Sequence, residues 1–211
     1  MTVTTLRSGR VVSSGATQAQ HVDLYRKLLL RRKLLSHAIP GAVYVPFIGD
    51  GDIAAECYAD RNIYGADLDA ARVATASKRL KDSKIIVANC DGWPFPKVND
   101  TFSVADFDSY SDPYASFRAF WKNADRADRL VLFFTDGHRQ AIHRLKIYIA
   151  FDGSKESHLD TARYRTIYNT YYPRFVKPAF VKHIGPDWGI VKDMMYLRRD
   201  MLYWGCVIER N

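Results

Sequence analysis

VYVPFIGDGDIAAECYADRNIYGADLD, residues 43–69, is the stretch that decides the fold. It begins with an apolar run at 43–45 that is typical of a buried strand, and a helix-compatible run follows at 53–59. Between the two runs lie Gly49 and Gly51, which let the backbone turn sharply and come close to a ligand. A strand, a glycine-containing turn and a helix, in this order, predict a nucleotide-binding α/β unit whose helix start presents free amides to the ligand.

Acidic residues in this stretch indicate which nucleotide it suits. A second short strand is expected at 62–66, and Asp67 follows it at about the distance where such units place a carboxylate on ribose hydroxyls. Asp50 and Asp52 flank Gly51, where a phosphate-binding loop would carry neutral or basic residues. Their negative charge repels a pyrophosphate and attracts a cation. S-adenosylmethionine, with its sulfonium and amino groups, therefore fits this loop better than NAD.

The stretch resembles motif I of the class I S-adenosylmethionine-dependent methyltransferases, and PFIGDGD at 46–52 is most similar to the P-F-x-G-x-G form found in some nucleic-acid methyltransferases. The resemblance implies a Rossmann-like α/β fold with a seven-stranded, mostly parallel sheet, helices on both faces and a C-terminal antiparallel hairpin. It also implies S-adenosylmethionine as the cofactor, with a set of contact residues near the strand ends. These are Pro46, Phe47, Gly49, Asp50, Gly51, Asp67, Leu68, Asp91 and Gly92.

Within that set, the resemblance gives the two glycines the methionine pocket, Asp67 the ribose and Asp91 the adenine amino group. For Asp91 the alternative is an ordinary turn cap. The chain departs from the family at the end of the first strand, where many members have an acidic residue and this one has Val45 or Pro46. The contact to the methionine moiety is then assigned to Asp50 or Asp52.

A second informative stretch is FSVADFDSYSDPY, residues 102–114. A strand is expected at 102–105, and carboxylates follow it where ligands bind in open α/β sheets, beyond the carboxyl ends of the strands. The stretch resembles motif IV of amino-methylating nucleic-acid enzymes, in particular the D-x-D-P-[FY]-G-[ST]-P form of the tRNA guanine-N2 dimethyltransferases. The matching residues are Asp106, Asp108, Tyr110 and Pro113, and the departures are Ser109, Ser111 and Asp112.

The chemistry of amine methylation gives these residues roles. An exocyclic amine of a base is a weak nucleophile because its lone pair is delocalised into the ring, so a carboxylate that accepts its N–H groups can take up the proton. We predict Asp106 in this role, with Asp108 as the next choice. Tyr110, with Tyr114, is predicted to stack on a base that has been brought out of its helix. Asp112 is better explained as the cap of the following helix.

The remaining elements follow from hydrophobic periodicity and from turn residues. Helices are expected at 17–37, 70–81, 114–121 and 139–150, strands at 84–88 and 130–135, and a hairpin at 193–195 and 201–209. We divide the chain into an N-terminal basic arm and helix, 1–40, and a methyltransferase domain, 41–211. The hairpin looks like the antiparallel strands that close a class I methyltransferase sheet.

Composition limits the class of protein. With 211 residues and 47% hydrophobic content, the chain can bury a substantial core. It has no run of about 18 apolar residues and no apolar signal-peptide core, so we expect no membrane span and a cytoplasmic location. Cys57, Cys90 and Cys206 are far apart and predicted to be reduced, and neither His138 nor His143 has a second ligand at metal spacing. No metal site is expected.

The net charge of +8 and the sequence pI near 9.4 favour a polyanionic partner, although the same charge can simply keep a protein soluble. The basic helix at 17–37 is either docked with a solvated charged face or lies along a nucleic-acid backbone. Arginines and tyrosines are interleaved at 151–173, which fits phosphate contacts combined with stacking, or equally a helix whose tyrosines pack on the sheet.

Three functions remain open at this stage. We favour methylation of an exocyclic amine of a nucleic-acid base, with RNA ahead of DNA. The alternatives are a small-molecule methyltransferase and a non-catalytic subunit that binds cofactor or nucleic acid. The sequence makes no prediction of the oligomeric state.

Overall fold

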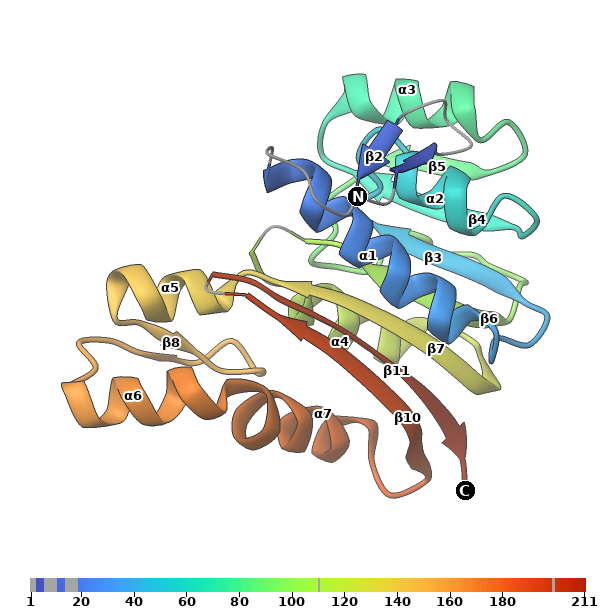
Figure 1. The fold of residues 1–211 in the computed structure, drawn as a ribbon. Coiled ribbons are helices and arrows are strands. Elements are labelled where there is room, and N and C mark those ends of the chain that lie inside the picture. The colour runs from blue at the N-terminus through green and yellow to red at the C-terminus, as the bar shows by residue number, and fades with distance from the viewer. Residues whose placement is uncertain (1–2, 6–10, 14–18, 110, 199) are drawn as a thin grey trace.

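The computed structural model describes residues 3–5, 11–13, 19–109, 111–198 and 200–211, so Tyr110 lies outside the described residues. A seven-stranded sheet forms the centre of the fold, in the order β10-β11-β7-β6-β3-β4-β5 (Figure 1). Its strands are β3 (Ala42–Pro46), β4 (Ile63–Asp67), β5 (Lys84–Val87), β6 (Phe102–Phe107), β7 (Arg126–Asp136), β10 (Trp188–Leu197) and β11 (Leu202–Arg210). The strands from β3 to β7 pair in parallel, whereas β11 pairs antiparallel with β7 and β10 antiparallel with β11.

Helices cover both faces of the sheet (Figure 1). The first face carries α1 (Ala19–Leu35), α2 (Asp52–Cys57) and α3 (Ala70–Arg79), and the second carries α4 (Tyr114–Asn123), α5 (His138–Leu145), α6 (Thr161–Thr170), the π-helix η1 (Tyr171–Val176) and α7 (Lys177–Ile184). The predicted architecture is therefore confirmed: a mostly parallel seven-stranded sheet, helices on both sides and a C-terminal antiparallel pair of strands.

Side-chain alternation along the strands explains the two layers. In β3, Val43 and Val45 belong to the hydrophobic cluster under α1 to α3, while Tyr44 belongs to the cluster under α4 to α7 and stacks on Phe120 with ring centroids 5.4 Å apart. All five residues of β3 are buried, as expected for a parallel strand covered on both faces. Because these strands run parallel, their carboxyl ends lie along the same edge of the sheet.

The helix α1 docks on the sheet through Leu28, Leu30 and Leu34, which are 2%, 1% and 0% exposed. Leu30 and Leu34 share a hydrophobic cluster with Val43 of β3. The apolar side of this basic helix is therefore docked on the sheet, as in the first of the two predicted arrangements. The division at residue 40 stays a prediction. Ahead of α1, β1 (Val3–Thr5) pairs antiparallel with β2 (Val11–Ser13). Among the described residues, the helices are all too short or too polar to cross a membrane.

The region after β7 differs most from the prediction. The helix expected at 139–150 ends at Leu145, because Lys146 adopts a left-handed backbone conformation with φ of 55°. A two-stranded ribbon follows, β8 (Tyr148–Ile149) and β9 (Lys155–Glu156), and then α6 and η1. Tyr171 and Tyr172 of η1 are 1% and 6% exposed, so for these two tyrosines the packing interpretation is correct and base stacking is wrong.

Candidate functional site

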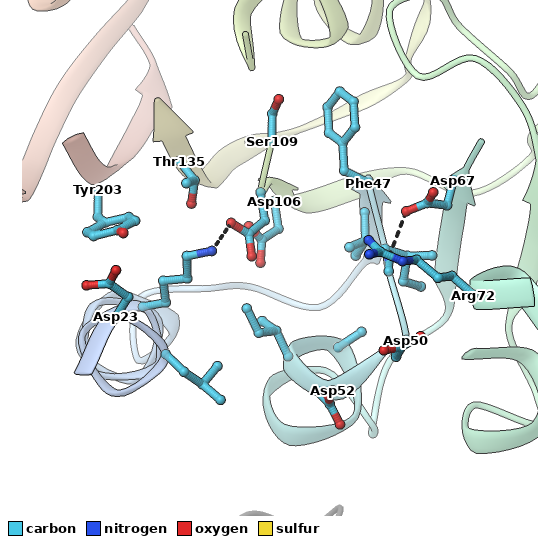
Figure 2. Close-up of a pocket in the computed structure, with 18 of the residues that line it drawn as sticks. Asp23, Phe47, Asp50, Asp52, Asp67, Arg72, Asp106, Ser109, Thr135 and Tyr203 are labelled. Atoms are coloured by element: carbon cyan, nitrogen blue, oxygen red, sulfur yellow. Dashed lines mark hydrogen bonds and ion pairs between the residues drawn. The ribbon is translucent and has the colours of Figure 1, made fainter. Parts of the chain in front are cut away.

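A cavity of about 690 Å³ opens at the carboxyl edge of the parallel strands, within the range of small-molecule sites. Figure 2 shows that its lining falls into two halves. The loop half lies around the end of β3, the turn after it, the start of α2 and the end of β4, and consists of Val45, Phe47, Ile48, Gly49, Asp50, Asp52, Ile53, Ala54, Asp67 and Arg72. The α1 half consists of Asp23, Leu24, Lys27, Asp106, Asp108, Ser109, Ser111, Thr135, Met201 and Tyr203.

The loop half owes its shape to three residues with positive φ. Phe47, Gly49 and Gly51 have φ of 62°, 55° and 77°, and this conformation costs a phenylalanine energy that a glycine does not incur. Gly51 begins α2, where a Cβ would lie 3.2 Å from Cα of Ala76 in α3. At Gly49, by contrast, a Cβ would meet nothing within 4 Å, so a ligand can approach the backbone there.

Asp67 is fixed by backbone amides. Its Oδ2 accepts a hydrogen bond from the Gly49 amide at 3.0 Å, and its Oδ1 accepts one from the Asp69 amide at 3.0 Å. Each carboxylate oxygen has a second lone pair and can accept a further donor. The predicted ribose carboxylate is thus tied to the predicted glycine turn, with accepting capacity left for two hydroxyl groups.

In the α1 half, Asp106 is fully buried and its two oxygens already accept three hydrogen bonds. Arg31 of α1, 1% exposed, donates from Nε to Oδ2 at 2.6 Å and from Nη2 to Oδ1 at 2.5 Å, and the Tyr58 hydroxyl donates to Oδ2 at 2.7 Å. Burial disfavours the Arg31 cation, but Asp106, Tyr58 and Asp108 together outweigh this and hold the pKa of Arg31 above its usual value. Asp106 is part of a closed buried ion pair.

Asp108 lies two residues further along and is 15% exposed. Lys27 of α1 donates to its Oδ1 at 2.6 Å, the Thr135 side chain also forms a hydrogen bond with it, and Arg31 lies 4.0 Å from its Oδ2. Burial raises the pKa of Asp108, but Lys27 and Arg31 outweigh it and the pKa is lowered overall. Asp108 is therefore an ionised carboxylate beside the cavity.

The far wall of the α1 half comes from the antiparallel strands. Thr135 of β7 and Tyr203 of β11 are register partners. Tyr203 forms a hydrogen bond with Asp23 of α1, and burial together with this carboxylate raises the pKa of Tyr203. Asp23 also pairs with Arg198 at the turn of the β10–β11 hairpin, so an ion pair joins α1 to the hairpin beside the cavity.

Not all of the sequence-predicted residues meet in the cavity. Those that line it are Phe47, Gly49, Asp50, Asp67, Asp106 and Asp108. Five predicted residues lie outside its lining. Pro46 is buried at the end of β3 and Gly51 at the start of α2. Leu68, next to Asp67, is 68% exposed, and Asp91 and Gly92 are exposed in the loop after β5. Asp52, the other acidic residue of the loop, is paired with Arg79 at 2.7 Å.

Several lining residues were missed by the sequence interpretation, among them Asp23, Lys27, Arg72, Thr135 and Tyr203. A signal existed for α1. Arg31 stands three residues after Leu28 and three before Leu34, on the apolar side of the helix, and a charge in that position predicts a buried partner. No comparable signal exists for Tyr203, because its place follows from the register of β11 against β7.

In comparisons by sequence, no protein-family model and no curated protein matches the chain. Among solved structures it is similar to the putative methyltransferase YhhF from Escherichia coli, with TM-score 0.56, 12% identity and coverage of 96% of this chain and 94% of that one. It is also similar to magnesium protoporphyrin IX methyltransferase (ChlM) from Synechocystis PCC 6803 with bound SAH, with TM-score 0.53, 14% identity and coverage of 94% and 90%.

A third similar structure is TrmN from Thermus thermophilus, with TM-score 0.51 and 16% identity over 87% of this chain. The match spans 49% of TrmN, about half of its length. At such identities the similarity establishes the fold. The chain has the Rossmann-like fold of the class I S-adenosylmethionine-dependent methyltransferases.

Proposed function

We propose that this protein is an S-adenosylmethionine-dependent methyltransferase that acts on an exocyclic amine of a nucleic-acid base, with RNA favoured over DNA. One observation carries the proposal. Asp67, tied to the glycine turn, and Asp108, an ionised carboxylate with partial exposure, line the same cavity at the carboxyl edge of the sheet. The proposed cofactor seat and the proposed acceptor for amine protons therefore share one cavity.

The loop half fits the cofactor. Its fixed carboxylate, Asp67, suits the ribose hydroxyls, and the open space at Gly49 admits the ligand to the backbone. Leu68, with its large exposed apolar surface beside Asp67, and Asp91 are assigned to the adenine, and Asp50 to the methionine amino group. The bound cofactor supplies a methyl group on a sulfonium, and the residues of the chain hold and orient the acceptor in line with it.

Between the two predicted carboxylates, we assign the acceptor role to Asp108. Asp106 is 0% exposed and already accepts three hydrogen bonds from Arg31 and Tyr58, so it is less available to an amine than Asp108. Asp108 is ionised, partly exposed and can accept an N–H of the acceptor amine and then its proton. We retain the prediction that Tyr110 stacks on the base, whereas Tyr114 is 1% exposed and donates to Asp136, so stacking by Tyr114 is wrong. The resemblance of this stretch to tRNA guanine-N2 dimethyltransferases supports RNA.

The charge in the cavity supports a neutral base as the group that enters it. Of the six aspartates in the lining, four are paired with cations. Asp50 and Asp67 form no ion pair among the described residues, so they repel a phosphate, whereas the N–H groups of a base find acceptors. The same acidic lining favours a second candidate, a small-molecule amine that carries a positive charge. Transfer to a free amine with no transfer to RNA or DNA would identify that candidate.

The test begins with isothermal titration of S-adenosylmethionine and S-adenosylhomocysteine into the wild type, Asp67→Ala and the exposed control Asp82→Ala. Loss of hydrogen bonds to a charged acceptor costs about 1.5–3 kcal/mol, so Asp67→Ala should weaken binding of both ligands roughly 10- to 150-fold. The control should bind like the wild type. Labelled-methyl transfer to RNA, DNA and amine pools then identifies the acceptor. No binding of either ligand to the wild type at millimolar concentration would refute the proposal.

A further inference from the structure

The region between β7 and α7 carries a large share of the positive charge. Residues 138–176, here called the basic insertion, contain seven Lys and Arg against three Asp and Glu. This surplus is half of the net charge of +8 of the whole chain. Figure 1 shows that α5, β8 and α6 of the insertion lie side by side beyond the end of the sheet to which β7 leads.

The tyrosines of the insertion are engaged within the protein. Tyr164 and Tyr168 stack on each other with ring centroids 5.4 Å apart, Lys146 Nζ lies 3.3 Å from the centroid of Tyr164, and Arg139 Cζ lies 3.8 Å from that of Tyr168. Tyr171 donates to the buried Asp136 at 2.9 Å. These rings are engaged in contacts within the protein, so the groups that the surface of the insertion presents to a partner are its charged side chains.

Much of that charge has no counter-charge in the protein. Arg163 pairs with Glu156 and Arg144 pairs with Asp200. Lys155, Arg165 and Arg174 are exposed, and within the described ranges none of these three forms an ion pair. Exposed cations without anionic neighbours bind polyanions by releasing condensed counterions.

The basic insertion begins close in sequence to the α1 half of the cavity, because Thr135, three residues before it, lines that half. A hollow of about 260 Å³ lies between α5 and the loop after β6, and Ser111 lines both this hollow and the main cavity. Arg144 of α5 also lines this hollow. A strand whose base enters the main cavity beside Asp108 would therefore continue past Ser111 onto the insertion.

We propose that the basic insertion binds the phosphodiester backbone of the nucleic-acid substrate on the side of the target base, through Lys155, Arg165 and Arg174. The inference rests on the proposed function and adds the surface that holds the substrate. The acidic cavity accepts the uncharged base, and the basic insertion accepts the phosphates. Because the tyrosines are engaged internally, this surface contacts phosphates without reading bases, and binding there is independent of sequence.

The test is fluorescence anisotropy with a fluorescein-labelled 20-nucleotide single-stranded RNA of mixed sequence, over a range of salt. The variant Lys155→Glu/Arg165→Glu/Arg174→Glu is compared with a control of equal charge change on other elements, Lys78→Glu/Lys81→Glu/Lys97→Glu, all exposed. Three lost phosphate contacts should reduce the slope of log K against log salt by about 2 and weaken binding at least tenfold at 0.1 M salt. The control should stay within about threefold of the wild type.

Titration with S-adenosylhomocysteine shows that each variant is folded, since both triple variants should bind it like the wild type. Equal losses in the two triple variants would overturn the inference, because they would show a general effect of net charge. A wild type that binds S-adenosylhomocysteine but no RNA at low salt would instead refute the nucleic-acid part of the proposed function. The two failures are thus distinguishable.

Discussion

Replacing Arg31 by methionine should destabilise the protein far more than its place on a surface helix indicates. The guanidinium is 1% exposed and donates two hydrogen bonds to Asp106, which is 0% exposed. Removing one partner of a buried pair leaves the other charge without compensation and costs about 3–5 kcal/mol. In a domain of this size each kcal/mol corresponds to about 2–4 °C, so we expect the Tm to fall by roughly 6–20 °C.

Arg163 of α6 provides a matched control. It also pairs with a carboxylate, Glu156 at 2.9 Å, but the two side chains are 43% and 42% exposed. A surface pair of this kind is worth about 0–1 kcal/mol, so Arg163→Met should be nearly neutral. Urea denaturation followed by circular dichroism measures both variants. Equal losses for Arg31→Met and Arg163→Met, or a loss below about 1 kcal/mol for Arg31→Met, would refute the assignment of a closed buried pair.

Removing the whole network should restore much of the loss. Arg31→Met leaves the carboxylate of Asp106, and Asp106→Leu leaves the Tyr58 hydroxyl without its acceptor. The triple variant Arg31→Met/Asp106→Leu/Tyr58→Phe leaves neither, and well-packed apolar replacements of buried ion pairs are often neutral in stability. A triple variant as unstable as Arg31→Met would show that the cost comes from packing and not from the unpaired charge.

Three further predictions concern the cavity. Asp108→Asn should lower kcat about 10²- to 10⁴-fold with unchanged S-adenosylhomocysteine affinity, as expected for lost proton acceptance, and an unchanged kcat would contradict the assignment. Lys27→Met should raise the pKa of Asp108. The pKa of Asp108 is depressed in the folded protein, so the stabilisation by its ionised form is present above the ordinary aspartate pKa and is lost as the pH falls through the lower pKa of the folded state. Without Lys27 the pKa of the folded state is higher, so the acidic limb of the rate profile should move to higher pH. A limb that stays in place would contradict a role for Lys27. Gly51→Ala should destabilise by more than about 1 kcal/mol in thermal unfolding because of its φ of 77° and its contact with Ala76. Gly49→Ala has the same positive φ but lacks the contact, so it should destabilise less than Gly51→Ala and weaken ligand binding more, and the reverse order would contradict the geometry.

The loop half could be predicted from the sequence because its structure is local. Gly49, Gly51 and Asp67 lie within one strand-turn-helix-strand unit, and of these Gly49 and Asp67 line the cavity while Gly51 shapes the turn. The mostly parallel seven-stranded sheet was implied by the family resemblance that this unit carries. The choice between Asp106 and Asp108 could not be made in this way, because it depends on Arg31, 75 residues away in sequence.

The tyrosines after residue 163 illustrate the same limit. A run of aromatic and basic residues fits an RNA-binding surface and a packed helix equally well, and only the buried partners decide. Tyr171 donates to Asp136 and Tyr172 to Asp193, both contributed by strands of the sheet. Arg165 and Arg174, by contrast, are exposed and remain available for the proposed phosphate contacts.

The buried pair and the proposed acceptor site are coupled by the spacing of a helix against a strand. Lys27 and Arg31 are four residues apart on α1, a rise of about 6 Å, and Asp106 and Asp108 are two residues apart at the end of β6, about 6.6 Å in an extended chain. The near match lets Arg31 meet Asp106 while Lys27 meets Asp108. Arg31 thus fixes the position of α1 from which Lys27 reaches the cavity.

It follows that Arg31→Met should alter catalysis as well as stability, although Arg31 belongs to a buried pair. Without the hydrogen bonds from Arg31 to Asp106, α1 is held less firmly at the end of β6, and Lys27 therefore holds Asp108 less firmly. The charge of Arg31, 4.0 Å from Asp108, is also lost. The pKa of Asp108 should rise, and kcat should fall most at acidic pH, while S-adenosylhomocysteine affinity is retained because Asp67 and Gly49 are untouched. Measurements at a temperature well below the lowered Tm separate this effect from unfolding. A variant with wild-type kcat and an unshifted pH profile would show that α1 covers the cavity without controlling it.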